Sequence, residues 1–430
     1  MGEKERSLPL RKSFALLAAL THGVIRCLPV RKAMQQPANR PLKVIIIGAG
    51  IGGLAAACAL RQRGIEVQIF ERSVELGEVG AGLQIGPNGV KVLRALGLED
   101  ELMRNAFEPF SIMSITFDEG RLRFRQPLKA IAREKYGAPY MTAHRADLHN
   151  LLRRAIGDTP LTLGAHCVGA DTMNNAAVAR FADGTTAEAD IVIGADGIRS
   201  AIRAQHFGAG DPRFTGMMAW RCIVPMDCVP TRIGPGGSVE VEHGEYFGWI
   251  GRDGHVICYP IGVNGDKLNM FCGHVTKEWV EESWSVPSSR EELIAAKAGW
   301  NEALLEMFRH VEHVFKWGIH DRDPLPQWTR GRVTLLGDAA HPTMPTLAQG
   351  ANMAIEDGFV LARLLSRHGA DVAAALQAYP AARKPRTDWV TLNSRAQFAN
   401  NRKAAPPPFV DRTWLFVNDV VRGEGALQPT

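Results

Sequence analysis

The chain of 430 residues has no CxxC pair, and its seven cysteines are odd in number and widely spread. Zinc sites and disulfide frameworks need cysteines at short or paired spacings, and disulfides persist mainly in oxidising compartments. The pattern argues against a disulfide-stapled secreted scaffold and against a metal site. It predicts a protein of the reducing cytoplasm that binds no metal.

Long apolar runs are also missing. The best candidate lies in the first forty residues, but only Phe14–Leu20 is uninterrupted. A spanning helix needs about 20 predominantly apolar residues, so no stable membrane span is expected. A signal peptide would need a small-residue cleavage site, which this stretch lacks. A surface amphipathic helix, a non-functional extension and a true start at Met34 remain alternatives. We treat residues 1–40 as a flexible N-terminal extension.

Charge of one sign is not gathered in blocks. The formal net charge is +5 and the basic residues are dispersed, whereas nucleic-acid binding relies on clustered lysine and arginine. A nucleic-acid partner is therefore not expected. No internal repeat is present, and 46% hydrophobic with 22% charged residues is typical of a globular protein.

A strand–turn–helix pattern begins at Val44–Ile47, a continuous β-branched run typical of a buried strand. The sequence Gly48-Ala49-Gly50-Ile51-Gly52-Gly53 follows, then a strong helix former ending near Gly64 and a second strand over 66–72. This is the context that the GxGxxG dinucleotide fingerprint requires. The pattern predicts a βαβ unit that binds a nucleotide.

Each glycine of this fingerprint has its own task. Gly48 permits the tight turn, Gly50 lets backbone N–H groups approach a pyrophosphate, and Gly53 lets the helix pack on the sheet. The helix N-terminus favours the negative phosphate. Glu71, at the end of the second strand, can accept hydrogen bonds from an adenosine ribose, which argues against a 2′-phosphate. It can alternatively be a solvated strand end.

Two later stretches also read as strand, turn and helix. In "GADGIRS", residues 194–200, Asp196 leaves a strand and either turns the chain or binds a ligand. In "LLGDAAHPTMPTLAQGANMAIEDG", residues 335–358, a dozen residues separate strand from helix. Connections in α/β units usually have about 2–6 residues, so we expect the loop with Gly337-Asp338 to contact a ligand.

The domain pattern changes between about 214 and 317, where short apolar segments alternate with turns and helices follow. This predicts a mostly antiparallel sheet. Strand and helix return after 332, and residues 371–398 are expected to be helical with a break at the prolines. The predicted domains are 41–210 with 325–400, then 211–324, and a C-terminal tail at 401–430.

The three motifs, in this order and at wide spacing, resemble the signatures of the single-component (class A) FAD-dependent aromatic monooxygenases. The similarity is greatest to the salicylate and 3-hydroxybenzoate hydroxylase group, which has segments like "GEVGAGLQIGPNGVKVLRALGL" and "HRADLHNLL". It covers about residues 43–395. The resemblance implies an α/β fold: a Rossmann-like FAD-binding domain of the p-hydroxybenzoate hydroxylase type with an inserted, mostly antiparallel β-sheet substrate domain.

The resemblance also implies roles for individual positions. The backbone of residues 48–53 would hold the FAD pyrophosphate, and Glu71 with Arg72 the ribose. Further FAD contacts are implied at Arg145 beside the flavin, Val168 at the adenine, Asp196 for both FAD and NAD(P)H, Asp338 at the ribityl chain, and Gly350, Ala351 and Asn352 at the pyrimidine edge. A helix starting there would direct its positive end to the charge of reduced flavin.

The reaction implied is hydroxylation of a small, carboxylated aromatic of the salicylate or 3-hydroxybenzoate class. NADH or NADPH, a transient co-substrate, reduces a tightly but non-covalently bound FAD. O₂ then adds at flavin C4a, and the hydroperoxide transfers oxygen to the ring. No second GxGxxG is present, so NAD(P)H has no Rossmann domain of its own. A monomer or homodimer is expected.

The group that removes the substrate proton is not evident. Some relatives have histidine where this chain has Met217 and Met218, and a polar residue where it has Pro345 or Thr346. The alternatives are a substrate that binds already ionised, an aniline or N-heterocycle, or a water relay.

Three residues are candidates for the substrate site. Arg221 either pairs with a substrate carboxylate or forms a structural salt bridge. Tyr259 either faces the pocket or fills a core, and His341 is either an acid–base catalyst or a structural residue near the flavin. His243 and His255 lie near turns and are expected at the surface.

Other functions remain open on this fold. They are a flavin-dependent epoxidase, a hydroxylase of an N-heterocycle, an oxygen-insensitive flavin reductase and a non-enzymatic binding protein. Intact Gly50, Glu71, Asp196 and Asp338 argue against the last. A plain NAD dehydrogenase would explain the first motif but not the other two.

Overall fold

The computed structural model describes residues 40–77, 81–208, 210–251, 253–277, 279, 286–403 and 411–423. The expected N-terminal extension, apart from Arg40, and much of the expected tail lie outside these residues. Within the described ranges, no helix has the length and apolarity needed to cross a bilayer.

The first motif forms the centre of a six-stranded sheet. β1 (Lys43–Ile47) is parallel to β2 (Glu66–Phe70) on one side and to β11 (Ile191–Gly194) on the other, and α1 (Ile51–Arg61) joins β1 to β2. The sheet order is β20-β21-β11-β1-β2-β7, with β7 (Leu161–Thr162), β20 (Thr329–Arg330) and β21 (Val333–Leu335).

The register of this sheet brings the three sequence motifs together. Ile47 pairs with Gly194, and Gly194 pairs with Leu335, in parallel strands. The chain therefore leaves β1, β11 and β21 at the same edge. Ligands of open parallel sheets bind at this carboxyl edge, so the loops after the three strands are placed to share one site.

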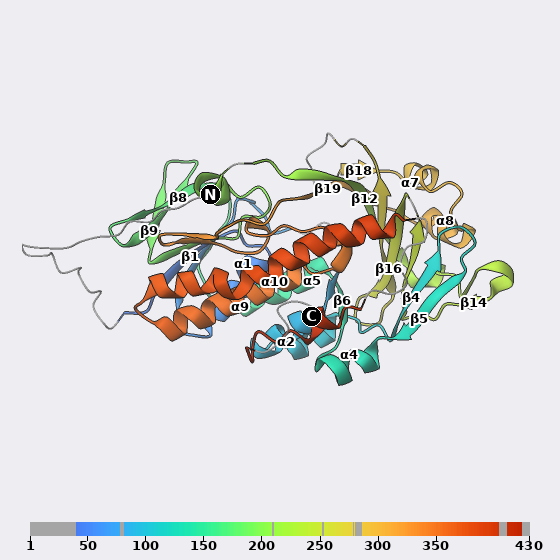
Figure 1. The fold of residues 1–430 in the computed structure, drawn as a ribbon, viewed down its shortest axis with the longest axis horizontal. Helices are drawn as coiled ribbons and strands as arrows, with labels where there is room; N and C mark the ends of the chain where they lie inside the picture. Colours follow the sequence, from blue (N-terminus) through green and yellow to red (C-terminus); the bar gives the residue numbers. More distant parts are fainter. Residues whose placement is uncertain are drawn as a thin grey trace, which may run out of the picture. The chain divides into compact units, whose positions relative to one another are not determined.

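Two long helices cover this part of the molecule. α9 (Gly350–His368) packs on α1, and α10 (Val372–Asn401) lies beside α9 (Figure 1). The expected break in α10 is wrong, because Pro380 and Pro385 both lie inside one continuous helix. Arg383 of α10 is buried against α9, and such tertiary packing overrides the local preference of the prolines.

The predicted antiparallel sheet is present and has eight strands. Its order is β18 (Val286–Ser288), β19 (Val314–Asp321), β12 (Arg213–Pro225), β17 (Lys267–Val275), β16 (Gly254–Ile261), β15 (Tyr246–Gly251), β4 (Ser111–Thr116) and β5 (Leu122–Pro127). Every neighbouring pair is antiparallel except β15 with β4. β4 and β5 come from the segment 41–210 that we assigned to nucleotide binding, so this sheet draws on two parts of the chain.

Side-chain alternation gives the eight-stranded sheet two different faces. One face buries Trp220, Trp249 and three cysteines against α7 (Arg290–Ala296) and α8 (Glu302–Arg309). The other face carries the alternate residues of the same strands, and several of them line a cavity. The six cysteines among the described residues are free thiols.

Smaller elements complete the fold. A two-stranded ribbon joins β3 (Gly82–Ile85) to β6 (Met141–His144), another joins β13 (Arg232–Ile233) to β14 (Val239–Glu240), and β8 (Cys167–Met173), β9 (Ala176–Phe181) and β10 (Thr186–Ala189) form a small sheet. The remaining α-helices are α2 (Pro87–Ala95), α3 (Glu99–Asn105), α4 (Lys129–Tyr136), α5 (Arg145–Ala155), α6 (Ala201–Phe207) and α11 (Thr413–Val417).

Candidate functional site

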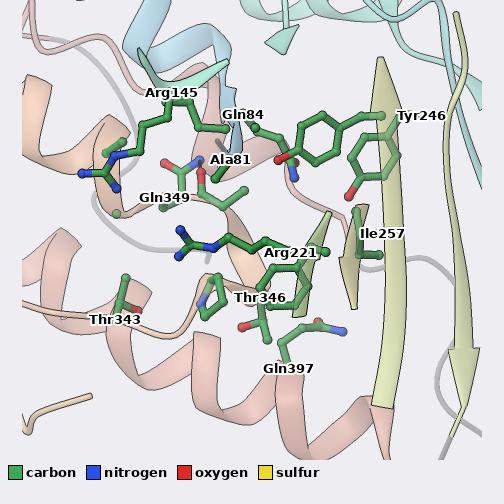
Figure 2. A pocket seen from close by; sticks show the side chains of 18 of the residues that line it. Ala81, Gln84, Arg145, Arg221, Tyr246, Ile257, Thr343, Thr346, Gln349 and Gln397 are labelled. Carbon is green, nitrogen blue, oxygen red and sulfur yellow. Dashed lines mark hydrogen bonds between the residues drawn. The ribbon is translucent and has the colours of Figure 1, made fainter. Parts of the chain in front are cut away.

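A cavity of about 470 Å³ is lined both by the motif loops and by the open face of the eight-stranded sheet. Figure 2 shows side chains from both sources pointing into it. Half of the sixteen residues predicted for the site line this cavity: Gly50, Gly52, Arg145, Arg221, Tyr259, Asp338, Gly350 and Ala351. The sequence motifs and the predicted sheet domain thus contribute to one site.

Two helix N-termini open onto the cavity. α1 starts after Gly50 and α9 after Gln349, neither helix has a side-chain cap, and neither has an acidic residue in its first turn. The first N–H groups of a helix lack intrahelical partners and carry partial positive charge. Both ends are therefore suited to the phosphate or carbonyl oxygens of a ligand.

The fingerprint glycines divide into two groups by their surroundings. Gly48 has φ +108°, and a Cβ there would lie 2.3 Å from the Ala195 carbonyl oxygen. A Cβ at Gly53 would lie 2.0 Å from the Gly48 carbonyl oxygen. A Cβ at Gly50 would meet no atom within 4 Å. Gly48 and Gly53 thus maintain the turn, whereas Gly50 leaves open space in front of α1.

Three residues predicted to contact the adenosine part do not line the cavity. Glu71 accepts hydrogen bonds from the Ala49 N–H (2.8 Å) and the Ser73 N–H (2.9 Å), which fixes it beside the glycine turn. Arg72 is exposed next to it, and Val168 on β8 is 43% exposed. Their contacts with a nucleotide stay predictions.

Two buried polar atoms beside the cavity have no partner within the described residues. Asp196 accepts a hydrogen bond from the Ala201 N–H at 2.9 Å, but its Oδ1 has no donor, and burial raises its pKa. The Thr343 hydroxyl, which lines the cavity, is likewise unpartnered. Buried polar atoms normally have hydrogen-bond partners. These two atoms, the open space at Gly50 and the two helix ends therefore fit a large polar cofactor such as FAD.

Among the described residues, Asp338 is the single carboxylate that lines the cavity. Its side chain is accessible through the cavity. Desolvation by the surrounding protein raises its pKa, while the charges of His341 and Arg145 lower it. Its position after β21 is the one expected for a group that binds cofactor hydroxyls.

His341 does not line the cavity. Its Nε2 lies 2.5 Å from Asp357 Oδ2, and Asp357 also accepts hydrogen bonds from Arg383 Nε (2.7 Å) and the Gly337 N–H (3.2 Å). Both side chains of the His341–Asp357 pair are buried. This position favours the structural alternative for His341 and does not favour acid–base catalysis.

Asn352 is also directed into the protein. Its Nδ2 donates to the Ala348 carbonyl at 2.8 Å, and its Oδ1 accepts from the Gly86 N–H at 3.0 Å. The side chain thereby ties the loop before α9 to the loop before α2. Whether its backbone N–H contacts a cofactor stays a prediction.

The sheet end of the cavity has an arginine and aromatic walls. Figure 2 shows Arg221 extending into the cavity, and its guanidinium carbon stacks 3.6 Å from the centroid of Trp317. Tyr259 lies parallel to Tyr246, with ring centroids 5.9 Å apart. Burial raises the pKa of both phenols, so their hydroxyls are neutral hydrogen-bond donors.

The expected surface position of His255 is wrong. His255 is buried and lines the cavity, stacked on Phe271 with centroids 5.5 Å apart, and burial lowers its pKa to about 4. The signal was available, because His255 lies four residues before Tyr259 on one strand and alternation puts both on the same face. His243 is exposed, as expected.

Other lining residues were not singled out from the sequence. Gln84 accepts a hydrogen bond from the Tyr140 hydroxyl at 2.5 Å, and Gln84, Gln397 and Arg412 all line the cavity. Gln397 and Arg412 reach it only because of the course of α10 and the segment after it, which no local pattern predicts.

The positions that differ from relatives also separate. Met217 is fully buried and does not line the cavity, whereas Pro345 and Thr346 do.

Comparisons with known proteins agree with this site. The model of the FAD binding domain family matches residues 41–394. A 3-amino-4-hydroxybenzoate 2-monooxygenase of Streptomyces platensis is 40% identical over 83% of this chain and 87% of its own length. A 6-hydroxynicotinate 3-monooxygenase of Pseudomonas fluorescens is 37% identical over 88% of this chain and 92% of its own.

A solved salicylate hydroxylase substrate complex is similar in fold, with a TM-score of 0.72 and 28% identity, covering 88% of this chain and 92% of that one. The family match spans most of the chain, and the two relatives exceed 30% identity over most of their lengths. The chain therefore belongs to the FAD binding domain family and is a flavoprotein monooxygenase of the class A aromatic hydroxylase type.

Proposed function

We propose that this enzyme hydroxylates a small aromatic or nitrogen-heteroaromatic carboxylate, with NADH or NADPH as reductant. One oxygen atom of O₂ enters the ring as a hydroxyl group. The other leaves as water with two electrons from NAD(P)H and one further proton.

The observation that carries this proposal is the charge of the cavity. Within the part of the chain that the structure describes, one carboxylate, Asp338, lines the cavity together with four arginines: Arg123, Arg145, Arg221 and Arg412. Arg221 lies among aromatic side chains, stacked on Trp317, where a guanidinium pairs well with a carboxylate. Such a site favours a flat, anionic substrate.

FAD held at the motif loops would supply the activation of O₂ and the oxygen transfer. Asp338, Arg145 and the N-terminus of α9 would hold the cofactor on one side of the cavity. Phe271, Trp317 and the stacked tyrosines would exclude water from the other side. These residues position the substrate and protect the reaction, while the cofactor carries the redox chemistry.

The substrate can be a benzene ring or a nitrogen heterocycle. The relatives at 40% and 37% identity are named for an aminohydroxybenzoate and a hydroxynicotinate, and both ligands combine a carboxylate with a ring hydroxyl. The shared chemistry, a hydroxylated ring with one carboxylate, is what we propose for this enzyme. The free state of the described cysteines supports a cytoplasmic site of action.

Replacing Arg221 tests the proposal. Arg221→Gln in the FAD-loaded enzyme should lower the affinity for 3-hydroxybenzoate and for benzoate by about 10- to 100-fold, because a charge-assisted hydrogen-bonded pair is lost. The affinity for phenol should stay almost unchanged. Binding is measured by perturbation of the flavin absorbance spectrum.

Arg309→Gln on the exposed surface of α8 is the matched control, because its ion pairs with Glu302 and Glu306 lie outside the cavity. Equal affinities for carboxylates in wild type and Arg221→Gln would contradict the proposal. Turnover assays must also separate hydroxylated product from H₂O₂. Formation of H₂O₂ alone with every carboxylate would favour the flavin-reductase alternative.

A further inference from the structure

The described end of the chain forms a strap over the active-site region. Residues 411–423, here called the C-terminal strap, lie beyond residue 394, where the family match ends. Its helix α11 contacts α2 and α4, and the buried Phe416 ring lies 5.4 Å from Tyr136 and 5.7 Å from Tyr140, measured between centroids.

Cationic side chains of the FAD-binding part anchor the strap by its backbone. Lys91 Nζ donates to the carbonyls of residues 416–418 at 3.2 to 3.3 Å. Arg386 Nη2 donates to the Leu415 carbonyl at 2.9 Å. Both cations are buried, so charge-assisted bonds in a low-dielectric setting hold the strap in one place.

Arg412, at the start of the strap, lines the cavity. Its Nη2 donates to the Thr346 carbonyl at 3.4 Å. Across the ranges that the structure describes, no carboxylate lies within ion-pair distance of it. The anchored strap thus presents a guanidinium to the cavity whose charge no acidic side chain neutralises.

The two arginines act on different members of the stacked tyrosine pair. Burial raises the pKa of Tyr246, and Arg412 opposes that rise. Burial likewise raises the pKa of Tyr259, and there Arg221 opposes it. Both arginines and both tyrosines line the same cavity, and the tyrosine rings are parallel. An aromatic substrate bound against this pair therefore has two cations within the same cavity.

We propose that Arg412 binds the ring oxygen of the substrate in its ionised form, while Arg221 binds the carboxylate. The inference rests on the proposed function, because it assumes a hydroxylated aromatic carboxylate. On binding, the substrate O–H bond breaks, its electron pair stays on oxygen, and the proton passes to solvent. Arg412, with the hydroxyl of Tyr246 that lines the same cavity, then stabilises the oxyanion. Arg412 is thus a substrate-specificity residue, supplied by a segment outside the family match.

Besides the arginines, the ionisable groups that line the cavity within the described residues are one carboxylate and three groups that are neutral near pH 7. Its charged groups are four arginines and Asp338, and its remaining titratable groups are His255, Tyr246 and Tyr259. The histidine has a low pKa and the tyrosines have raised ones, so all three are neutral near pH 7. The charge of Arg412 beside the ring oxygen lowers the pKa of a bound phenol, which offers an alternative to a histidine at Met217 or Met218.

The test compares three ligands on the FAD-loaded full chain by flavin absorbance. Arg412→Gln should lower the affinity for 3-hydroxybenzoate by about 10- to 100-fold and the affinity for benzoate by less than about twofold. The affinity for phenol should fall as much as the affinity for 3-hydroxybenzoate. Arg422→Gln, in the same strap and 72% exposed, is the control and should change none of the three.

A second measurement follows ionisation directly with 3-hydroxy-4-nitrobenzoate, whose phenolate is coloured. Its bound pKa should lie below its free pKa in wild type and in Arg412→Lys, and should rise by about one unit or more in Arg412→Gln. Arg412→Lys keeps the charge, so it carries the test if Arg412→Gln does not retain FAD.

The outcomes separate the two proposals. Equal loss of benzoate and 3-hydroxybenzoate in Arg412→Gln, or a bound pKa that does not respond to the charge at 412, overturns the inference alone. A wild type that binds no aromatic carboxylate overturns the proposed function and the inference with it.

Discussion

The environment of a single residue decides its chemistry in this site, and His255 is the clearest example. It lies on a strand whose alternate side chains line the cavity, and burial lowers its pKa to about 4. A neutral imidazole is a weak proton acceptor at that pKa but a good hydrogen-bond acceptor for a substrate hydroxyl. Its titration therefore affects folding more than catalysis near pH 7.

This predicts acid sensitivity. An unfolded histidine titrates near pH 6.5, so below that pH the unfolded state binds a proton that the folded state rejects. Stability should fall as the pH drops from about 6.5 to about 4, by up to about 3 kcal/mol for this group. Denaturant unfolding at pH 7 and pH 4.5 measures the loss, which His255→Gln should reduce.

His243→Gln, at an exposed histidine, should leave the pH dependence unchanged. The same acid-induced loss in wild type and His255→Gln would contradict the assignment.

Single residues also show how far the sequence predicts the site. Gly50, Asp338 and Gly350 follow strands or open helices in recognisable motifs, so the sequence alone places them at the cavity. The expectation for His255 is wrong because it gives the nearby turn more weight than strand alternation. Arg412 has no signal in the sequence, because its contact with the cavity depends on how residues 411–423 pack on α2 and α4.

At the scale of elements, the turn between β1 and α1 separates structure from ligand binding. Gly48 needs a positive φ and close contact with the Ala195 carbonyl, whereas Gly50 has φ −71° and open space before it. The two glycines lie two residues apart, yet backbone conformation and a steric clash restrict Gly48, whereas only a bound ligand would restrict Gly50.

Alanine substitutions should separate these limits. Gly48→Ala should destabilise the protein even without FAD, by roughly 1–3 kcal/mol or more, because a left-handed φ and a steric clash are forced on a side chain. Gly50→Ala should leave apoprotein stability nearly unchanged but weaken FAD binding, since its methyl group enters the cavity. Thermal unfolding with and without FAD measures both effects. A Gly50→Ala apoprotein as unstable as Gly48→Ala would refute the distinction.

The sequence predicts the type of an element better than its length. The strands around the three motifs and the helix starting at Gly350 agree with the pattern of apolar residues. α10 does not, because two prolines suggest a break. Arg383 lies on α10, and its buried side chain pairs with two carboxylates of α9. Local propensity does not include such contacts between helices.

At the scale of the whole molecule, each sheet pairs strands that lie far apart in the sequence. β4 pairs with β15 although more than a hundred residues separate them along the chain, and Gly194 of β11 pairs with Leu335 of β21. The predicted division at residue 210 therefore separates β4 and β5 from the other strands of the eight-stranded sheet, whereas the six-stranded sheet lies wholly within the predicted domain 41–210 with 325–400. The apolar pattern predicts both sheets but not this exchange, because strand partners distant in sequence leave no local signal.

A fragment of residues 41–210 should consequently fail to fold. It would leave β4 without β15 and β11 without β21, and it would lack Asp338 and α9. Circular dichroism during thermal unfolding and FAD titration should show no cooperative transition and no flavin binding, while the 41–430 chain shows both. A fragment that unfolds cooperatively and retains FAD would show that the nucleotide part is independent.

The pairing of Ile47 with Gly194, and of Gly194 with Leu335, also sets an order on synthesis. During translation β1 is made long before its partner β11, and β11 is made long before its partner β21. The nascent protein must therefore expose strand edges until more than three quarters of it has been translated. Unpaired strand edges make partly folded chains prone to aggregation, so we expect misassembly of this chain to begin before β21 has been made.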